Sequence, residues 1–242
     1  MNYKLVIAFD GSYYKGWQFQ KNALTVQQVM TETARRFFSS DVTVTGCSRT
    51  DSGVHAENYV LSIKTDKVIP ADAIVRGMNT FLPPSVAVKE CTVVSEDFHP
   101  RYDCISKEYR YRILNSAIPD PFLAGRAYRV PAKLDEEKMA RDAEQLIGKH
   151  NFASFMAAGS KITDPTRTIF HASVSRDGDL IEFSVSADGF LYNMVRIITG
   201  TLIDLNLGRN ENTMTQIIEA ENRSVAGFTA PPDGLVLYSV KY

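Results

Sequence analysis

The order of two hydrophobic periods along the chain is the feature that most constrains its fold. Near the N-terminus, Tyr3, Leu5, Ile7 and Phe9 alternate with polar or small residues, as in a half-buried strand. After Thr25, apolar and small residues recur at helical spacing, and Gln28 stands at the capping-box position. The expected elements are strands at 3–9, 42–45, 59–63 and 86–94 and helices at 26–37 and 71–81. This β-α-β-β-α-β order predicts a ferredoxin-like unit.

The second half of the chain repeats these periods with longer connections. Gly148 is expected to cap a helix, and Asp177-Gly178 to form a hairpin turn. The expected elements are strands at 108–114, 126–130, 168–175, 180–186 and 235–242 and helices at 139–147, 190–205 and 213–221. We therefore expect an α+β fold of two ferredoxin-like halves with antiparallel sheets, residues 1–100 and 101–242. A cleft between such halves is a natural place for a site.

The composition excludes several classes of protein. The chain of 242 residues has a net charge of −1, so its bulk charge gives no sign of nucleic-acid binding. Arg101 to Arg112 form either a locally basic stretch or a solvated strand with mixed charges. No apolar run is long enough for a membrane span, and the N-terminus is typical of a strand rather than a signal peptide. Three widely spaced cysteines suit a reducing cytoplasm, and four isolated histidines predict no metal site.

The run from Cys47 to Ala56 contains the strongest candidate for chemistry. Asp51 follows Arg49 by two residues and precedes Gly53 by two, after a β-branched segment. The guanidinium would depress the pKa of this carboxyl and keep it ionised, as a nucleophile or a base requires. The alternative is an ordinary salt bridge between Arg49 and Asp51 in a turn.

Two further segments carry unusual residues. Arg196 is the only charged residue of an otherwise apolar helical segment, so it needs a carboxylate partner, for which Asp51 is the candidate. The alternatives are exposure to solvent or pairing with Asp188 or Asp204. Tyr109 shares one strand face with Tyr111, where it can either stack on a nucleobase or pack in the core.

Together these segments resemble the tRNA pseudouridine synthase A family over essentially the whole chain. The Asp51 loop is the most specific of them. The matching segments are Phe9-Asp10-Gly11, Gly16-Trp17-Gln18, Arg49 to Ala56, Phe98 to Tyr102, Lys107 to Tyr111, Phe152 to Phe155, Arg167-Thr168-Ile169, Phe190 to Arg196 and Ala230-Pro231-Pro232. Ser48, Ser52 and Ile197 depart from the usual residues of the family, which puts the exact target positions in doubt.

The resemblance implies a cytoplasmic isomerase that needs no cofactor and no metal. It would convert uridine to pseudouridine at positions 38, 39 and 40 of the tRNA anticodon arm and act as a homodimer in the pseudouridine synthase fold. Asp51 falls on the catalytic aspartate, and Arg196 on the arginine that pairs with it. Arg49 falls on the arginine implicated in flipping the target nucleotide, and Tyr109 on the tyrosine that contacts the base.

Two other functions fit parts of the sequence. A non-catalytic RNA-binding module is compatible with ferredoxin-like sheets that carry strand tyrosines. Asp51-Ser52-Gly53 also fits half of an aspartic protease site, but such a site needs two carboxylates side by side. The chain contains no second D-[ST]-G, so the protease reading requires a dimer.

Overall fold

The computed structural model describes residues 1–160 and 162–242, which form two compact units. Unit 1 contains Met1–Ile105 and Val236–Tyr242, and unit 2 contains Ser106–Leu235. The expected division was 1–100 and 101–242, whereas the structure groups the C-terminal residues 236–242 with unit 1. The chain is therefore a mixed α+β protein whose N-terminal unit is completed by its last strand.

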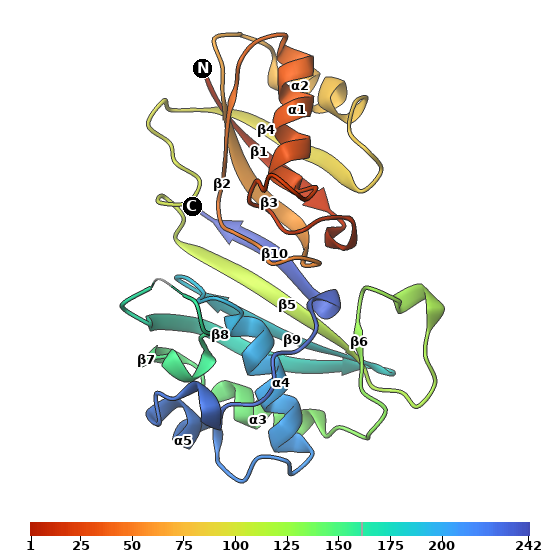
Figure 1. Ribbon diagram of the computed structural model, residues 1–242, viewed down its shortest axis with the longest axis vertical. Helices are drawn as coiled ribbons and strands as arrows, with labels where there is room; N and C mark the ends of the chain where they lie inside the picture. Colours follow the sequence, from red (N-terminus) through yellow and green to blue (C-terminus); the bar gives the residue numbers. More distant parts are fainter. Residues whose placement is uncertain (161) are drawn as a thin grey trace. The chain divides into compact units, whose positions relative to one another are not determined.

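Unit 1 has the predicted β-α-β-β-α-β order (Figure 1). Strands β4, β1, β3 and β2 pair antiparallel in that order. β10 pairs parallel with His55 and Ala56 of β3, on the edge where β2 pairs with residues 61–64. The elements are β1 (Asn2–Phe9), α1 (Val26–Phe38), β2 (Thr43–Gly46), β3 (His55–Lys64), α2 (Ala71–Asn79), β4 (Val86–Val94) and β10 (Leu235–Lys241).

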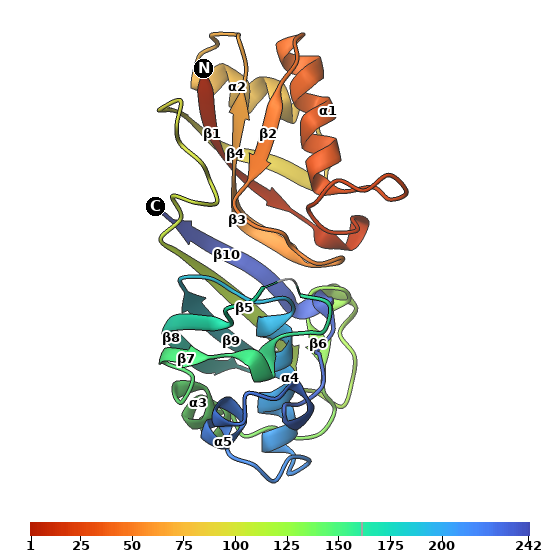
Figure 2. The same ribbon diagram turned by 60° about the vertical axis from the view of Figure 1, so that its left-hand side comes forward.

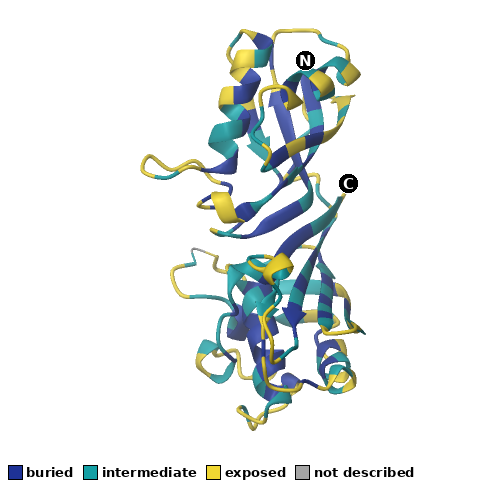
Figure 3. Cartoon of the chain, turned by 90° about the vertical axis from the view of Figure 1, so that its right-hand side faces the viewer, coloured by how far each residue is buried: buried dark blue, intermediate teal, exposed yellow. Residues whose placement is uncertain are grey.

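The core of unit 1 follows the alternation of β1. Tyr3, Leu5 and Ile7 are fully buried, and the ring of Tyr3 stacks on that of Phe38 from α1. Figures 2 and 3 show α1 and α2 beside the sheet and the buried residues along its strands. Thr25 caps α1 by accepting from the amide of Gln28 at 3.3 Å. The predicted N-terminus of this helix is thus confirmed.

Unit 2 contains the expected core order but not a simple repeat of unit 1. β5, β9, β8 and β7 form an antiparallel sheet, and β6 pairs parallel with β5. β6, β7 and α5 are added to the β5-α3-β8-β9-α4 core. The elements are β5 (Ser106–Leu114), β6 (Tyr128–Arg129), α3 (Glu136–Glu144), β7 (Gly148–Asn151), β8 (Thr166–Asp177), β9 (Leu180–Ala187), α4 (Met194–Asn206) and α5 (Met214–Glu219).

Three sequence predictions for unit 2 are wrong in detail. α4 begins at Met194 rather than Phe190, because Asn193 before it has a left-handed backbone. Gly148 does not cap α3, which ends at Glu144, but opens β7 with φ +118°. The hairpin turn is shifted by one residue, because Asp177 pairs with Leu180 and only Gly178 has positive φ in this turn. Positive φ at the first of two central residues fits a type II′ turn.

Helix α4 is the buried centre of unit 2. It has 13 residues and is apolar on nearly every side. Within the described ranges, no helix is long and apolar enough to cross a membrane. The segment at Gly227 and Phe228 crosses α4 in direct contact, because the amide of Gly227 donates to Thr201 Oγ1 at 2.9 Å. A Cβ on Gly200 would overlap the carbonyl oxygen of Phe228.

We predict that Gly200→Ala destabilises the protein by about 1–3 kcal/mol, because the carbonyl of Phe228 must move to admit the methyl group. An exposed helix would instead gain ~1 kcal/mol from this change. The matched control is Gly77→Ala in α2, where the nearest atoms that a Cβ would meet belong to the half-buried side chain of Phe37 rather than to the backbone. Urea unfolding followed by circular dichroism measures the free energy of unfolding of both variants. A Gly200→Ala variant as stable as the wild type would contradict the close contact.

Candidate active site

The Asp51 loop joins β2 to β3 in unit 1. Asp51 is half-buried. The amide of Val54 donates to the carbonyl oxygen of Asp51 at 3.2 Å and so closes a four-residue turn. Gly53, the third residue of this turn, has φ +84°. A type II turn requires positive φ at that position, which explains the glycine two residues after the aspartate.

Two glycines from the segment after β1 lie directly against the backbone of this loop. A Cβ on Gly11 would overlap the carbonyl oxygen of Val54, and a Cβ on Gly16 would overlap that of Thr50. The amide of Trp17 donates to Thr50 O at 3.3 Å. Since no side chain fits between the two backbones, the residues 10–17 fix the position of the Asp51 loop. This contact explains why residues 11 and 16 of the segment are glycines.

Two stacked aromatic rings support the start of the Asp51 loop. Trp17 is the only tryptophan of the chain and stacks on Tyr59 with ring centroids 4.3 Å apart. The hydroxyl of Tyr59 donates to the carbonyl oxygen of Ser48 and accepts from the Ser48 amide at 3.4 Å. Gly46 leaves room for both rings. Tyr59 therefore anchors the start of the loop, a role that no local sequence pattern indicates.

His55 ties the same segment to the end of the loop. Its Nδ1 atom accepts from the amide of Gly11 at 3.1 Å and lies 3.1 Å from Asp10 Oδ1. Asp10 Oδ1 also accepts from the amide and the hydroxyl of Ser12. His55 is 6% exposed, and these contacts join the segment after β1 to the first residue of β3.

Arg49 is exposed and forms no ion pair or hydrogen bond with the residues that the structure describes. The alternative in which Arg49 and Asp51 form a turn salt bridge is therefore not what the structure shows. An exposed guanidinium two residues from a half-buried carboxylate is instead placed where a polyanion can reach it.

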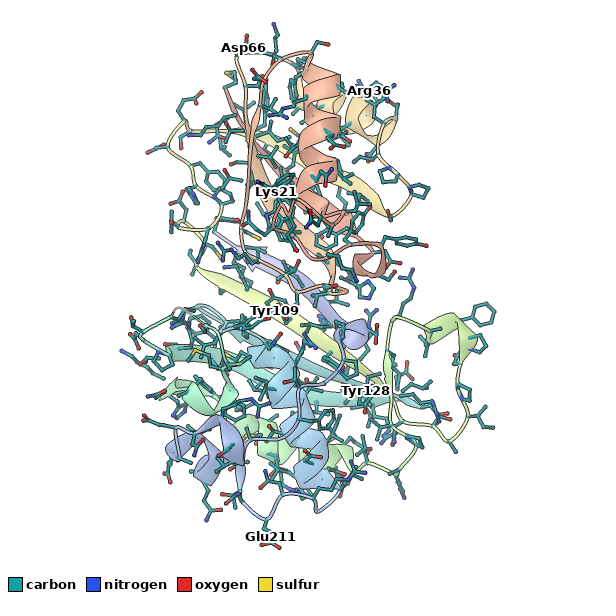
Figure 4. The ribbon with its side chains drawn as sticks, viewed as in Figure 1. Lys21, Arg36, Asp66, Tyr109, Tyr128 and Glu211 are labelled. Carbon is teal, nitrogen blue, oxygen red and sulfur yellow. The ribbon has the colours of Figure 1, made fainter. Side chains whose placement is uncertain are left out.

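Tyr109 lies on β5 in unit 2, where Figure 4 labels it. It is 7% exposed, and its ring meets that of Phe190 edge-on with centroids 4.9 Å apart. Lys107 and Tyr111 share its buried face, as predicted.

The basic stretch of the sequence is largely neutralised on the opposite face of β5. Arg110 forms ion pairs with Glu108 and Glu182 at 3.0 and 3.2 Å, and Arg112 pairs with Glu182 at 3.3 Å. For Arg110 and Arg112, these contacts agree with the interpretation of the stretch as a strand with mixed charges.

Arg196 is held at the start of α4 by neutral acceptors. Its Nε donates to the carbonyl oxygen of Ala230 at 2.7 Å, and its Nη1 donates to Asn193 Oδ1 at 3.0 Å. The backbone carbonyl of Arg196 in turn accepts from the amide of Ala230 at 3.0 Å. The two acidic alternatives are engaged elsewhere, since Asp188 accepts from Thr168 and Asp204 pairs with Arg209.

The segment Ala230-Pro231-Pro232 also fixes Tyr111. The hydroxyl of Tyr111 donates to the carbonyl oxygen of Pro231 at 2.6 Å. Burial raises the pKa of Tyr111, while the positive charge of Arg196 opposes that effect. Tyr111 is therefore a neutral hydrogen-bond donor, and Arg196 lies near enough to act on it electrostatically.

The predicted site residues are thus divided between the units. Asp51 and Arg49 share one loop of unit 1, while Tyr109 and Arg196 belong to β5 and α4 of unit 2. Within the described residues, no group of three His, Cys, Asp or Glu side chains is arranged to hold a metal ion. The predicted residues comprise a carboxylate and a guanidinium group in unit 1 and a guanidinium group and an aromatic ring in unit 2.

Comparisons with known proteins identify the family. A sequence model of the tRNA pseudouridine synthase family matches residues 5–103 and 143–242. The tRNA pseudouridine synthase A of Acetivibrio thermocellus is 43% identical over 100% of this chain and 99% of its own. The proteins of the same name from Thermoanaerobacter sp. and Geotalea daltonii are each 39% identical over the same shares.

Likeness to solved structures is weaker. A chain from a Cbf5-Nop10-Gar1 complex aligns with a TM-score of 0.34 and 10% identity, over 95% of this chain and 56% of that one, which supports no argument. The match to the family model covers most of the chain, and the relatives match along its full length. The chain belongs to the tRNA pseudouridine synthase family.

Proposed function

We propose that this protein isomerises uridine to pseudouridine in tRNA, with Asp51 as the catalytic carboxylate. One observation carries the assignment of the residue. Asp51 is a half-buried carboxylate in a loop whose backbone is fixed by Gly11 and Gly16, in a chain that belongs to this family. A rigid, partly accessible carboxylate is what a nucleophile on a nucleotide requires.

The reaction breaks the N1–C1′ bond of uridine, turns the base and joins C5 to C1′. The proton on C5 is lost and N1 gains one, so the product is an isomer and no oxidant or reductant is consumed. The target nucleotide must first leave the stack, which costs a few kcal/mol. We assign the nucleophilic role to the ionised Asp51; removal of a sugar proton by the same carboxylate would also need its ionised form.

The other residues have roles that follow from their chemistry. We propose that the guanidinium of Arg196 pairs with Asp51, which favours the ionised carboxylate. Arg49, exposed beside Asp51, would contact the phosphates of the flipped nucleotide. Tyr109 would stack on the uracil and keep the detached base in place. The edge-on contact with Phe190 holds the ring of Tyr109 in one orientation.

We further propose the finer properties that the family resemblance implies. The targets are the uridines at positions 38, 39 and 40 of the anticodon arm, and the protein works as a homodimer in the cytoplasm. Incubation with an unmodified tRNA transcript, followed by carbodiimide-dependent reverse-transcription stops, tests the activity and maps the position together. RNA binding without any stop would favour a non-catalytic RNA-binding module.

We predict that Asp51→Ala folds and binds tRNA like the wild type but loses activity by a factor on the order of 10⁶, as expected for loss of an essential nucleophile. The matched control is Asp41→Ala, which removes an exposed carboxylate from the same unit. Single-turnover pseudouridine formation and filter binding of labelled tRNA measure the two properties. Activity of Asp51→Ala within tenfold of the wild type would refute the assignment.

We predict that Tyr109→Phe retains most activity, because the phenyl ring preserves the stacking surface. Tyr109→Ala should lower the single-turnover rate roughly 5- to 100-fold, the equivalent of ~1–3 kcal/mol of base stacking. The comparison separates the ring from the hydroxyl. Equal losses in the two variants would show that the hydroxyl, rather than the ring, carries the role of Tyr109.

A further inference from the structure

Asn193 has a backbone conformation that side-chain-bearing residues seldom adopt. Its φ and ψ are +59° and +12°, in the left-handed region, at the residue that precedes α4. In the described ranges, only Ser39 and Glu221 share a positive φ among residues other than glycine. Asparagine tolerates this region better than most residues do, but the conformation still requires an explanation from its surroundings.

Unlike the residues before three other helices, Asn193 makes no side-chain capping hydrogen bond. Thr25, Asp135 and Thr213 precede α1, α3 and α5 in extended conformations, and each accepts a hydrogen bond from the amide three residues later. Asparagine is among the best residues for this capping bond. Asn193 makes no such bond.

The side chain of Asn193 is used for the guanidinium of Arg196 instead. Asn193 Oδ1 accepts from Nη1 at 3.0 Å, while the carbonyl oxygen of Ala230 accepts from Nε at 2.7 Å. Two acceptors on two different nitrogens of a planar group fix both its position and the orientation of its plane. With the Nε bond alone, the end of the side chain could still turn about its own axis.

We propose that Asn193 is a positioning residue for the reaction, which holds the guanidinium of Arg196 in the orientation that Asp51 requires. This inference rests on the proposed function. Its physical basis is that a long, flexible side chain must otherwise be ordered anew in each turnover, and that small misplacements of a catalytic group lower rates by large factors. The helix start has no side-chain cap, and its asparagine orients the arginine one turn later.

Asn193→Gly tests the proposal, because glycine accepts the left-handed backbone and removes only the acceptor. The matched control is Glu221→Gly, which replaces another positive-φ residue of unit 2 that is exposed. The rate is measured in single turnovers with saturating enzyme, so that an inactive fraction does not lower it. We expect Asn193→Gly to slow pseudouridine formation about tenfold or more, with tRNA affinity within about twofold. Glu221→Gly should leave both unchanged.

A double-mutant cycle identifies the residue through which Asn193 acts. In an Arg196→Met background, Asn193→Gly should slow the reaction less than about twofold, because the group it positions is already absent. An equal loss in both backgrounds would overturn the proposal. If Asn193→Gly does not fold, Asn193→Ala, which also removes the acceptor, takes its place with the same expected loss of about tenfold or more. A rate of that variant within about twofold of the wild type would count against the proposal.

The activities of the wild type and of the Asp51→Ala and Asn193→Gly variants distinguish a failure of this inference from a failure of the proposed function. A wild-type protein that forms no pseudouridine in any tRNA transcript would remove both. An active wild type with an inactive Asp51→Ala, together with an unimpaired Asn193→Gly, would remove only the role of Asn193.

Discussion

The candidate site depends on contact between two backbones without side chains between them. Gly11 and Gly16 approach the carbonyl oxygens of Val54 and Thr50 so closely that neither position admits a Cβ. The loop that carries Asp51 is therefore held by main-chain geometry, to which the stack of Trp17 on Tyr59 adds an anchor. A carboxylate on such a loop needs little reordering, which is the physical condition that the proposed role of Asp51 requires.

In unit 2, hydrogen-bond acceptors rather than a close backbone contact fix the candidate side chain. Its charged candidate, Arg196, is fixed by acceptors from Asn193 and Ala230, and Pro231 receives the hydroxyl of Tyr111. Prolines 231 and 232 restrict the backbone that presents these carbonyl groups. The close packing of Gly200 against Phe228 keeps this segment against α4. The two scaffolds share one principle, in which glycine and proline fix the backbone and the backbone orients the side chains.

The sequence predicts those features that depend on neighbours along the chain. The period of two placed Tyr109 and Tyr111 on one face of β5, and Thr25 marked the start of α1. The left-handed backbone of Asn193 moved the start of α4, because an apolar run of helical period does not reveal a backbone reversal at its edge. The Ala230 carbonyl that accepts from Arg196 lies 34 residues away in sequence, and the Tyr59 hydroxyl that anchors Ser48 lies 11 residues away, so no local pattern could indicate them. The spacing of Asp51 to Gly53 agrees with the turn that the structure shows, in which Gly53 has positive φ.

We propose that Asp51 and Arg196 act in one site, and chemical cross-linking tests this proposal most directly. Cys47, Cys91 and Cys104 would first be replaced by serine, and Asp51→Cys combined with Arg196→Cys. The account predicts rapid intramolecular cross-linking of this pair by a short bifunctional maleimide. A control chain with Asp51→Cys alone, which keeps a single cysteine, should form no intramolecular cross-link. No cross-link between positions 51 and 196 in a folded chain would contradict the account.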